Sequence, residues 1–132
     1  NIALQNIQAR TRAPLIWMVA NINNFLLLNT SNRSEAAVGY TTADGDSCGS
    51  ISPIAGVSKK FILEWLNYYH TENSMTEEFD ALKHILNQQP TAELKPLSEN
   101  QSDEKDLMSY DLLNTIETCF VRDKMGPNSI KE

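Results

Sequence analysis

The segment DGDSCGS, residues 44–50, gathers the residue types in this chain that are best suited to chemistry. A cysteine between small residues could act as a nucleophile if a base lay beside it, because the thiolate is the reactive form. The two histidines, His70 and His84, both fall in predicted helices, and no cysteine-protease signature is completed around Cys48. We therefore favour an exposed or loop-buried cysteine over a catalytic one. A serine nucleophile at Ser47 is a weaker hypothesis still.

The same segment and the histidines offer no metal site. If Asp44 were position 1 of a calcium-binding EF-hand loop, position 5 would be Cys48 and position 12 would be Ala55, so the bidentate carboxylate is missing. The two cysteines and two histidines share no paired spacing that zinc sites use. Neither a G-x-G-x-x-G nor a GK[ST] phosphate loop occurs. The sequence predicts no catalytic residue, no metal and no cofactor.

Charge and hydropathy exclude two classes of partner. The 132 residues carry 17 acids and 11 bases, a net charge of −6. Nucleic acids and anionic membranes both attract a surplus of Lys and Arg, so neither is expected to bind here. The most apolar stretch, residues 13–28, is shorter than the roughly 20 apolar residues of a membrane span and includes three asparagines. We expect no membrane insertion.

Apolar spacing predicts the elements that must position these residues. A helix is expected from just after Pro14 to Leu28, preceded by the remnant of an earlier one. Its predicted core positions are Leu15, Met18, Val19, Ile22, Phe25 and Leu26, with Leu27 and Leu28 widening the face. Three more helices are expected at about 59–70, 75–88 and 109–124. Ser58 is the predicted N-cap of the first of these, and Ser74 with Glu77 has the spacing of a capping box at the start of the second. Residues 29–58 and 88–106 are polar, without apolar periodicity, and predict two long, poorly ordered loops.

This pattern predicts an all-α fold, a helical bundle of about four main helices with two long, partly disordered loops. Residues 1–132 would form a single helical domain or a fragment of a larger one. In the second helix, Trp65 and Tyr69 are expected in the core and Tyr68 at the surface. Eleven acids against three lysines lie between Glu72 and Glu117. We interpret them as a solvated face plus an acidic linker; the alternative is a surface that recruits a basic partner.

The two cysteines leave the compartment open. Cys48 and Cys119 could pair if the protein were secreted, and N-x-S/T sequons occur at Asn29, Asn32 and Asn100. Because thirteen asparagines would produce one or two sequons by chance, they give weak support. Cys119 falls on the apolar face of the last predicted helix, where a free thiol packs well. We favour two free thiols and a reducing compartment.

The C-terminal stretch LLNTIETCFVRDKMGPNSIKE resembles the dilute (DIL) domain of class V myosin globular tails. In the first helix, Trp17, Ala20 and Asn21 resemble that family's aromatic-Trp-Leu-(Ala/Ser)-Asn segment, although one extra residue follows Trp17 here. The C-terminal residues that carry the resemblance are Leu113, Asn114, Thr115, Met125, Pro127, Ile130 and Lys131, with Tyr110 and Leu112 just upstream.

The resemblance implies a non-enzymatic, cytoplasmic module that links an actin-based motor to vesicles or organelles. Its partners would be protein cargo adaptors or vesicle receptors and the remainder of the same globular tail, against which an exposed apolar surface would pack. No cargo-binding residue of that family maps onto the matched positions, so the partner-binding residues stay unknown. The alternative is a secreted or periplasmic inhibitor- or immunity-type helical domain with a Cys48–Cys119 disulfide.

Overall fold

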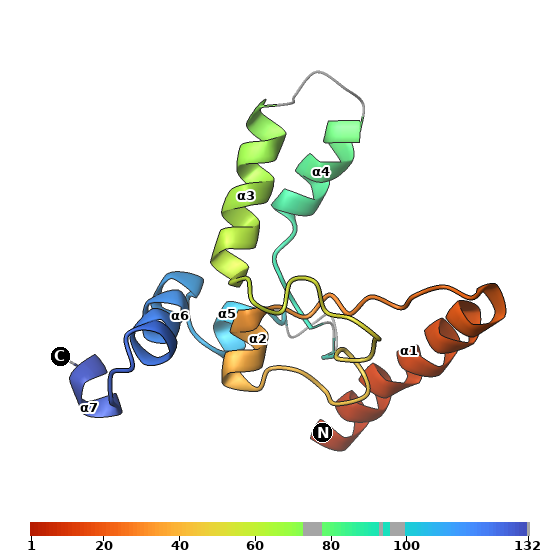
Figure 1. Ribbon diagram of the computed structural model, residues 1–132, viewed down its shortest axis with the longest axis horizontal. Coiled ribbons are helices and arrows are strands. Elements are labelled where there is room, and N and C mark those ends of the chain that lie inside the picture. Colours follow the sequence, from red (N-terminus) through yellow and green to blue (C-terminus); the bar gives the residue numbers. More distant parts are fainter. Residues whose placement is uncertain (73–77, 93, 96–99, 132) are drawn as a thin grey trace. The chain divides into compact units, whose positions relative to one another are not determined.

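The structure, a computed structural model, describes residues 1–72, 78–92, 94–95 and 100–131 (Figure 1). These residues fall into two compact units. The N-terminal unit comprises residues 1–57 with 94–95, and the C-terminal unit comprises the other described residues, from 58 onward. The helices are α1 (Ile2–Asn23), α2 (Arg33–Val38), α3 (Lys59–Glu72), α4 (Glu78–Asn87), α5 (Asp103–Asp106), α6 (Tyr110–Glu117), the π-helical turn η2 (Thr118–Arg122) and α7 (Pro127–Ile130).

Helix α1 runs through Pro14 without a break, so the predicted start after Pro14 is wrong. The N-cap of the helix is Asn1, whose side chain accepts a hydrogen bond from the Ala3 N–H at 3.0 Å. Proline inside a helix costs about 3 kcal/mol, because one backbone donor is lost. Ala9 and Ala13, which directly precede the two residues between which the helical hydrogen bond is lost, are both buried. The short remnant predicted ahead of Pro14 is therefore the first half of one helix.

The buried face of α1 consists of small residues. Ala9 is 0% exposed, and Ala13 and Ala20 are nearly as well buried, whereas Ile22 is 71% exposed. The predicted core positions of this helix are therefore wrong within this unit: all six expose about half or more of their surface. They are Leu15, Met18, Val19, Ile22, Phe25 and Leu26.

Helix α1 ends at Asn23, with Asn24 as its C-cap, and the residues that follow are not helical. Asn24 adopts the left-handed conformation (φ 53°), which asparagine tolerates better than most residues. Leu28 forms an isolated parallel bridge with Ile51. The prediction that Leu27 and Leu28 widen the face of the helix is therefore wrong.

The predicted loop 29–58 contains more regular structure than its composition suggested. It includes α2, whose C-cap Gly39 adopts the left-handed conformation, and it includes Ile51, which forms the bridge with Leu28. The Arg33 N–H donates to the Val57 carbonyl at 2.9 Å, which ties the two ends of the segment together. Poor order across this segment stays a prediction.

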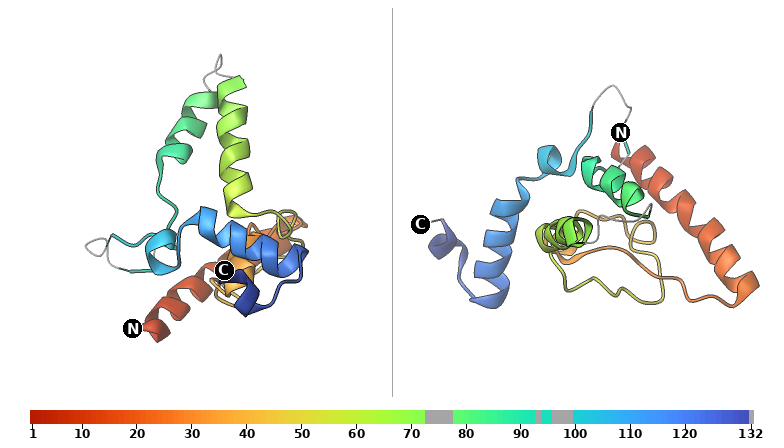
Figure 2. Two further views of the ribbon diagram at one scale, coloured as in Figure 1. Left: turned by 90° about the vertical axis from the view of Figure 1, so that its left-hand side faces the viewer. Right: turned by 90° about the horizontal axis from the view of Figure 1, so that it is seen from above.

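In the C-terminal unit, α3 and α4 form a helical hairpin, and Figures 1 and 2 show the two helices side by side. The predicted cap of α3 is confirmed, since the Ser58 hydroxyl accepts from the Phe61 N–H at 3.2 Å. The predicted capping box of the next helix, Ser74 with Glu77, lies outside the described residues. The predicted helix 109–124 corresponds to α6 and η2 together.

The aromatic residues of α3 lie at the surface. Trp65 and Tyr69 stack with ring centroids 5.3 Å apart, but both are exposed, so their predicted place in the core is wrong. The prediction that Tyr68 is exposed is confirmed. In α6, Leu113 is buried as expected. The all-α class and the bundle of about four main helices remain predictions, since the described residues form two separate units of helices with one isolated bridge.

Candidate functional site

A loop of residues 42–49 lies directly against the first half of α1. Gly45 approaches the α1 backbone so closely that a Cβ atom on it would lie 3.1 Å from the Ala9 carbonyl carbon. Gly49 approaches the backbone of Asn29, the residue after Leu28. A Cβ atom added to Gly49 would lie 2.7 Å from the Asn29 nitrogen. Gly49 also has φ +154°, a conformation that L-residues rarely adopt. The contact at Gly49 needs glycine, whereas a side chain at Gly45 would require the Ala9 backbone to give way by a few tenths of an ångström.

Hydrogen bonds hold the loop in two successive turns. The Gly45 N–H donates to the Thr42 carbonyl and the Cys48 N–H donates to the Gly45 carbonyl, both at 3.0 Å. The Asp46 carboxylate accepts from the Thr42 N–H at 3.3 Å. From α1, the Arg10 Nε donates to a loop carbonyl, that of Ala43, at 3.0 Å. The arginine is therefore held where helix and loop meet.

Helix and loop enclose a hollow of about 470 Å³, a volume usual for small-molecule sites. Its lining brings together a guanidinium group, an indole ring, a carboxylate, a hydroxyl and a thiol. Arg10, Ala13, Pro14 and Trp17 line it from α1, and Asp44, Ser47, Cys48 and Gly49 line it from the loop. Pro14 also removes the helical hydrogen bond that the Arg10 carbonyl would otherwise accept. The hollow can bind an anion at Arg10 and a flat ring at Trp17.

A second polar network fixes the start of α2. The Glu35 carboxylate accepts from the Ser31 hydroxyl at 3.0 Å and from the Asn32 side-chain amide at 2.6 Å. In return, the Asn32 side chain accepts from the Glu35 N–H at 3.1 Å, which completes a capping box. Asn29 accepts from the Ser31 N–H at 2.6 Å. Asn29 and Asn32 are buried, so these two sequons do not suit a glycan.

The residues that the sequence offered as candidates for catalysis belong to different units of the chain. Cys48 lines the hollow, and the neighbouring Ser47 hydroxyl donates to the Thr42 carbonyl at 3.4 Å. His70 and His84 belong to the C-terminal unit, in α3 and α4. Within the described ranges, no group of three or more His, Cys, Asp or Glu side chains is placed to hold a metal ion.

Arg10 and Trp17 were not predicted as site residues because the predicted helix begins too late. Arg10, Ala13, Pro14 and Trp17 follow the i, i+3, i+4, i+7 spacing of one helical face. That signal exists only if the helix continues through Pro14. Among the described helices, none is both long enough and apolar enough to span a membrane.

Comparisons with known proteins match the whole chain. The family model of NAD synthase matches residues 1–132. The glutamine-dependent NAD(+) synthetase of Aquifex aeolicus is 36% identical over 130 residues, which are 98% of this chain and 22% of that protein. The NH3-dependent NAD(+) synthetase of Thermococcus sibiricus is 37% identical over 132 residues, which are 98% of this chain and 46% of that protein.

A solved structure of a protein with the same kind of name also matches this chain. The crystal structure of a glutamine-dependent NAD(+) synthetase from Cytophaga hutchinsonii has a TM-score of 0.70 and 41% identity, over 98% of this chain and 18% of that one. The chain thus spans about a fifth of the glutamine-dependent relatives and just under half of the NH3-dependent one.

These matches overturn the resemblance to myosin tails and everything it implied. The relatives are synthetases, so the predictions of a non-enzymatic module, of cargo adaptors or vesicle receptors and of a myosin remainder as partners are wrong. The secreted alternative is unsupported too, and both Cys48 and Cys119 are free thiols. The matched residues such as Leu113 and Pro127 occupy the buried side of a helix and the first turn of another, positions that many helical proteins fill alike. The chain belongs to the NAD synthase family.

Proposed function

We propose that this chain is part of an enzyme that forms NAD+, and that the hollow between α1 and loop 42–49 is part of its dinucleotide-binding site. The observation that carries the proposal is the match of the whole chain to relatives of two kinds. One kind is named for glutamine and the other for NH3 as the nitrogen source. A segment that both kinds share belongs to the step that both perform, the formation of NAD+ itself.

The chemistry of the hollow fits a dinucleotide. NAD+ carries a pyrophosphate and two aromatic bases joined to ribose rings. The Arg10 guanidinium is suited to phosphate oxygens, and because its Nε already donates to Ala43, the two terminal nitrogens would make the contact. The Trp17 indole offers a surface on which a base can stack, and the Asp44 carboxylate can accept from ribose hydroxyls.

We also propose a cytoplasmic location. Free thiols at Cys48 and Cys119 suit a reducing compartment.

The test is a chimera in which this chain replaces the aligned part of the Thermococcus sibiricus enzyme, assayed for NAD+ formation from ammonium. In the chimera, Arg10→Ala should raise the KM for the dinucleotide substrate about 10- to 100-fold, because a charge-assisted hydrogen bond contributes about 1.5–3 kcal/mol. Arg10→Lys should recover only part of this loss, since a lysine cannot form bidentate hydrogen bonds with a phosphate group.

The matched control is Arg12→Ala. Arg12 lies two residues away on α1, is exposed and does not line the hollow, so its removal should leave KM within about twofold. A folded chimera without NAD+ formation would refute the proposed activity. Equal effects of the Arg10 and Arg12 variants would refute the assignment of the hollow.

A further inference from the structure

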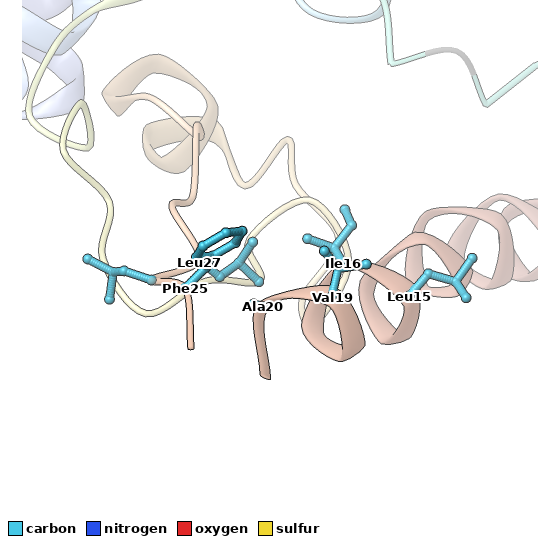
Figure 3. A pocket seen from close by; sticks show the side chains of 7 residues that line it. Leu15, Ile16, Val19, Ala20, Phe25 and Leu27 are labelled. Atoms are coloured by element: carbon cyan, nitrogen blue, oxygen red, sulfur yellow. The ribbon is translucent and has the colours of Figure 1, made fainter. Parts of the chain in front are cut away.

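Two hollows beside α1 differ in what they can recognise. The first, assigned above to the dinucleotide, contains the charged side chains Arg10 and Asp44. The second, of about 350 Å³, lies at the end of α1, and all of the side chains that line it are apolar (Figure 3). They are Leu15, Ile16, Val19, Ala20, Phe25, Leu26 and Leu27. The charge of a ligand is therefore recognised in the first hollow and not in the second.

The Asp44 carboxylate lines the first hollow without a partner. In the part of the chain that the structure describes, it takes part in no hydrogen bond and no ion pair, although Arg10 lines the same hollow. The Arg10 Nε donates to the Ala43 carbonyl, which leaves the two terminal nitrogens for a ligand. Two opposite charges that share a hollow without neutralising each other are complementary to a ligand that itself carries an anion and a cation.

The backbone on both sides of Asp44 is held in place. The preceding carbonyl, that of Ala43, accepts from Arg10, and the following residue, Gly45, packs closely against α1. The Gly45 N–H donates to the Thr42 carbonyl at 3.0 Å, which closes a four-residue turn whose third residue is Asp44. Asp44 has φ 61°, a left-handed conformation that aspartate tolerates better than most residues. The carboxylate is therefore positioned before a ligand arrives.

NAD+ carries a matching pair of charges. Its nicotinamide ring is a pyridinium cation whose nitrogen is bonded to a ribose, and the same ribose carries one of the phosphates. One sugar therefore separates the positive charge from the negative one, whereas the adenosine half has a phosphate but no cation. In the hollow the two charges are also neighbours, because Arg10 contacts Ala43, the residue that precedes Asp44. The nicotinamide half is the better complement to this hollow.

We propose that Asp44 selects the oxidised, cationic form of the dinucleotide over the reduced form. This inference rests on the proposed NAD+ formation and on the assignment of the hollow. The phosphate binds at Arg10, and the ring lies between the half-buried Trp17 indole and the Asp44 carboxylate. An indole face also attracts a planar cation. The reduced nicotinamide ring is neutral and gains neither interaction, so NAD+ competes with the substrate for this site and NADH does not.

Binding of NAD+ and of NADH to the Thermococcus sibiricus chimera, measured by isothermal titration calorimetry, tests the proposal without turnover. The chimera should bind NAD+ at least about tenfold more tightly than NADH, because NADH lacks both the ion pair and the cation–π contact. Asp44→Asn should weaken NAD+ binding about fivefold and change NADH binding less than about twofold. Asparagine tolerates the left-handed conformation too, so the turn is retained. Asp44→Glu keeps the charge and should retain most of the preference.

The matched control is Asp46→Asn. Asp46 belongs to the same loop and has the same charge, but it does not line the hollow, and its carboxylate accepts from the Thr42 N–H. This variant should keep the preference for NAD+ within about twofold of that of the parent chimera. Three results would overturn the proposal: equal affinities of the parent for NAD+ and NADH, a preference that Asp44→Asn leaves unchanged, or an equal loss of preference in Asp46→Asn.

A failure of this selection is distinguishable from a failure of the proposed activity. A chimera that forms NAD+ but binds NAD+ and NADH equally would keep the activity and remove the role of Asp44. A chimera that forms no NAD+ but loses its preference for NAD+ in Asp44→Asn would refute the activity and support the role of Asp44.

Discussion

In the N-terminal unit, backbone atoms approach one another directly where glycine and alanine leave room, whereas in the C-terminal unit a side-chain ion pair joins two helices. Gly45 lies on Ala9, and Gly49 lies on Asn29. In the C-terminal unit, Lys60 of α3 forms an ion pair with Asp111 of α6. The hollow assigned to the dinucleotide belongs to the first kind of structure. Close backbone contact gives rigid walls to a site, but it leaves little room for substitution.

Gly49→Ala should reduce stability more than any other substitution proposed for either unit. The added Cβ would lie within 3 Å of the Asn29 backbone, and alanine would be strained at φ +154°. We expect a loss of about 3 kcal/mol in the free energy of unfolding of the N-terminal unit, from strain and overpacking together. Urea unfolding monitored by Trp17 fluorescence, in a W65F background, measures it.

The matched control for this variant is Gly56→Ala. Gly56 lies in the same unit, and a Cβ on it would have no atom within 4 Å. Its free energy of unfolding should stay within about 0.5 kcal/mol of the parent. If the two alanine variants were equally stable, the close contact between loop 42–49 and Asn29 would not exist in solution.

The same contrast explains what could be predicted from the sequence. In the C-terminal unit, apolar spacing and caps located α3 and the region of α6 and η2, because these helices follow local rules. In the N-terminal unit, the contacts that matter join residues far apart in the chain, such as Gly45 with Ala9 and Arg10 with Ala43. Spacing within one segment contains no information about them.

The core predicted for the first helix was wrong for a related reason. The periodicity of Leu15, Val19 and Ile22 is real, but it says only that a face is apolar and not which partner covers it. Within the N-terminal unit these side chains are exposed, so their spacing alone did not predict their burial. The DGDSCGS segment was considered for catalysis and for metal binding and neither was predicted, whereas Arg10 and Trp17, which line the same hollow, were not considered at all.

The loss of stability that follows removal of a helix cap should also differ between the two units. In the N-terminal unit the Asn32 side chain is buried and exchanges hydrogen bonds with Glu35, so Asn32→Ala should cost about 2 kcal/mol. In the C-terminal unit, Ser109 caps α6 through an exposed bond to the Leu112 N–H at 3.4 Å. Ser109→Ala should cost about 0.5 kcal/mol. Thermal unfolding by circular dichroism measures both, and a reversed order would contradict the contrast between the units.

The smallest effect is expected from the exposed ion pair of the C-terminal unit. Asp111 raises the pKa of Lys60, first through its hydrogen bond at 2.5 Å and then through its charge. Because the folded-state pKa lies above the unfolded one, the pair stabilises the fold below the unfolded pKa of lysine, about 10.4, and this contribution disappears as the pH rises through the raised value.

Melting temperatures from pH 9 to 12 should therefore fall slightly more steeply for the parent than for Asp111→Asn, and high salt should reduce the difference. Glu64→Gln serves as the control, since Glu64 lies farther from the same ammonium group, at 3.8 Å, and should leave the slope nearly unchanged. Identical alkaline slopes for the parent and Asp111→Asn would mean that the pair contributes nothing, and that helix packing alone joins α3 to α6.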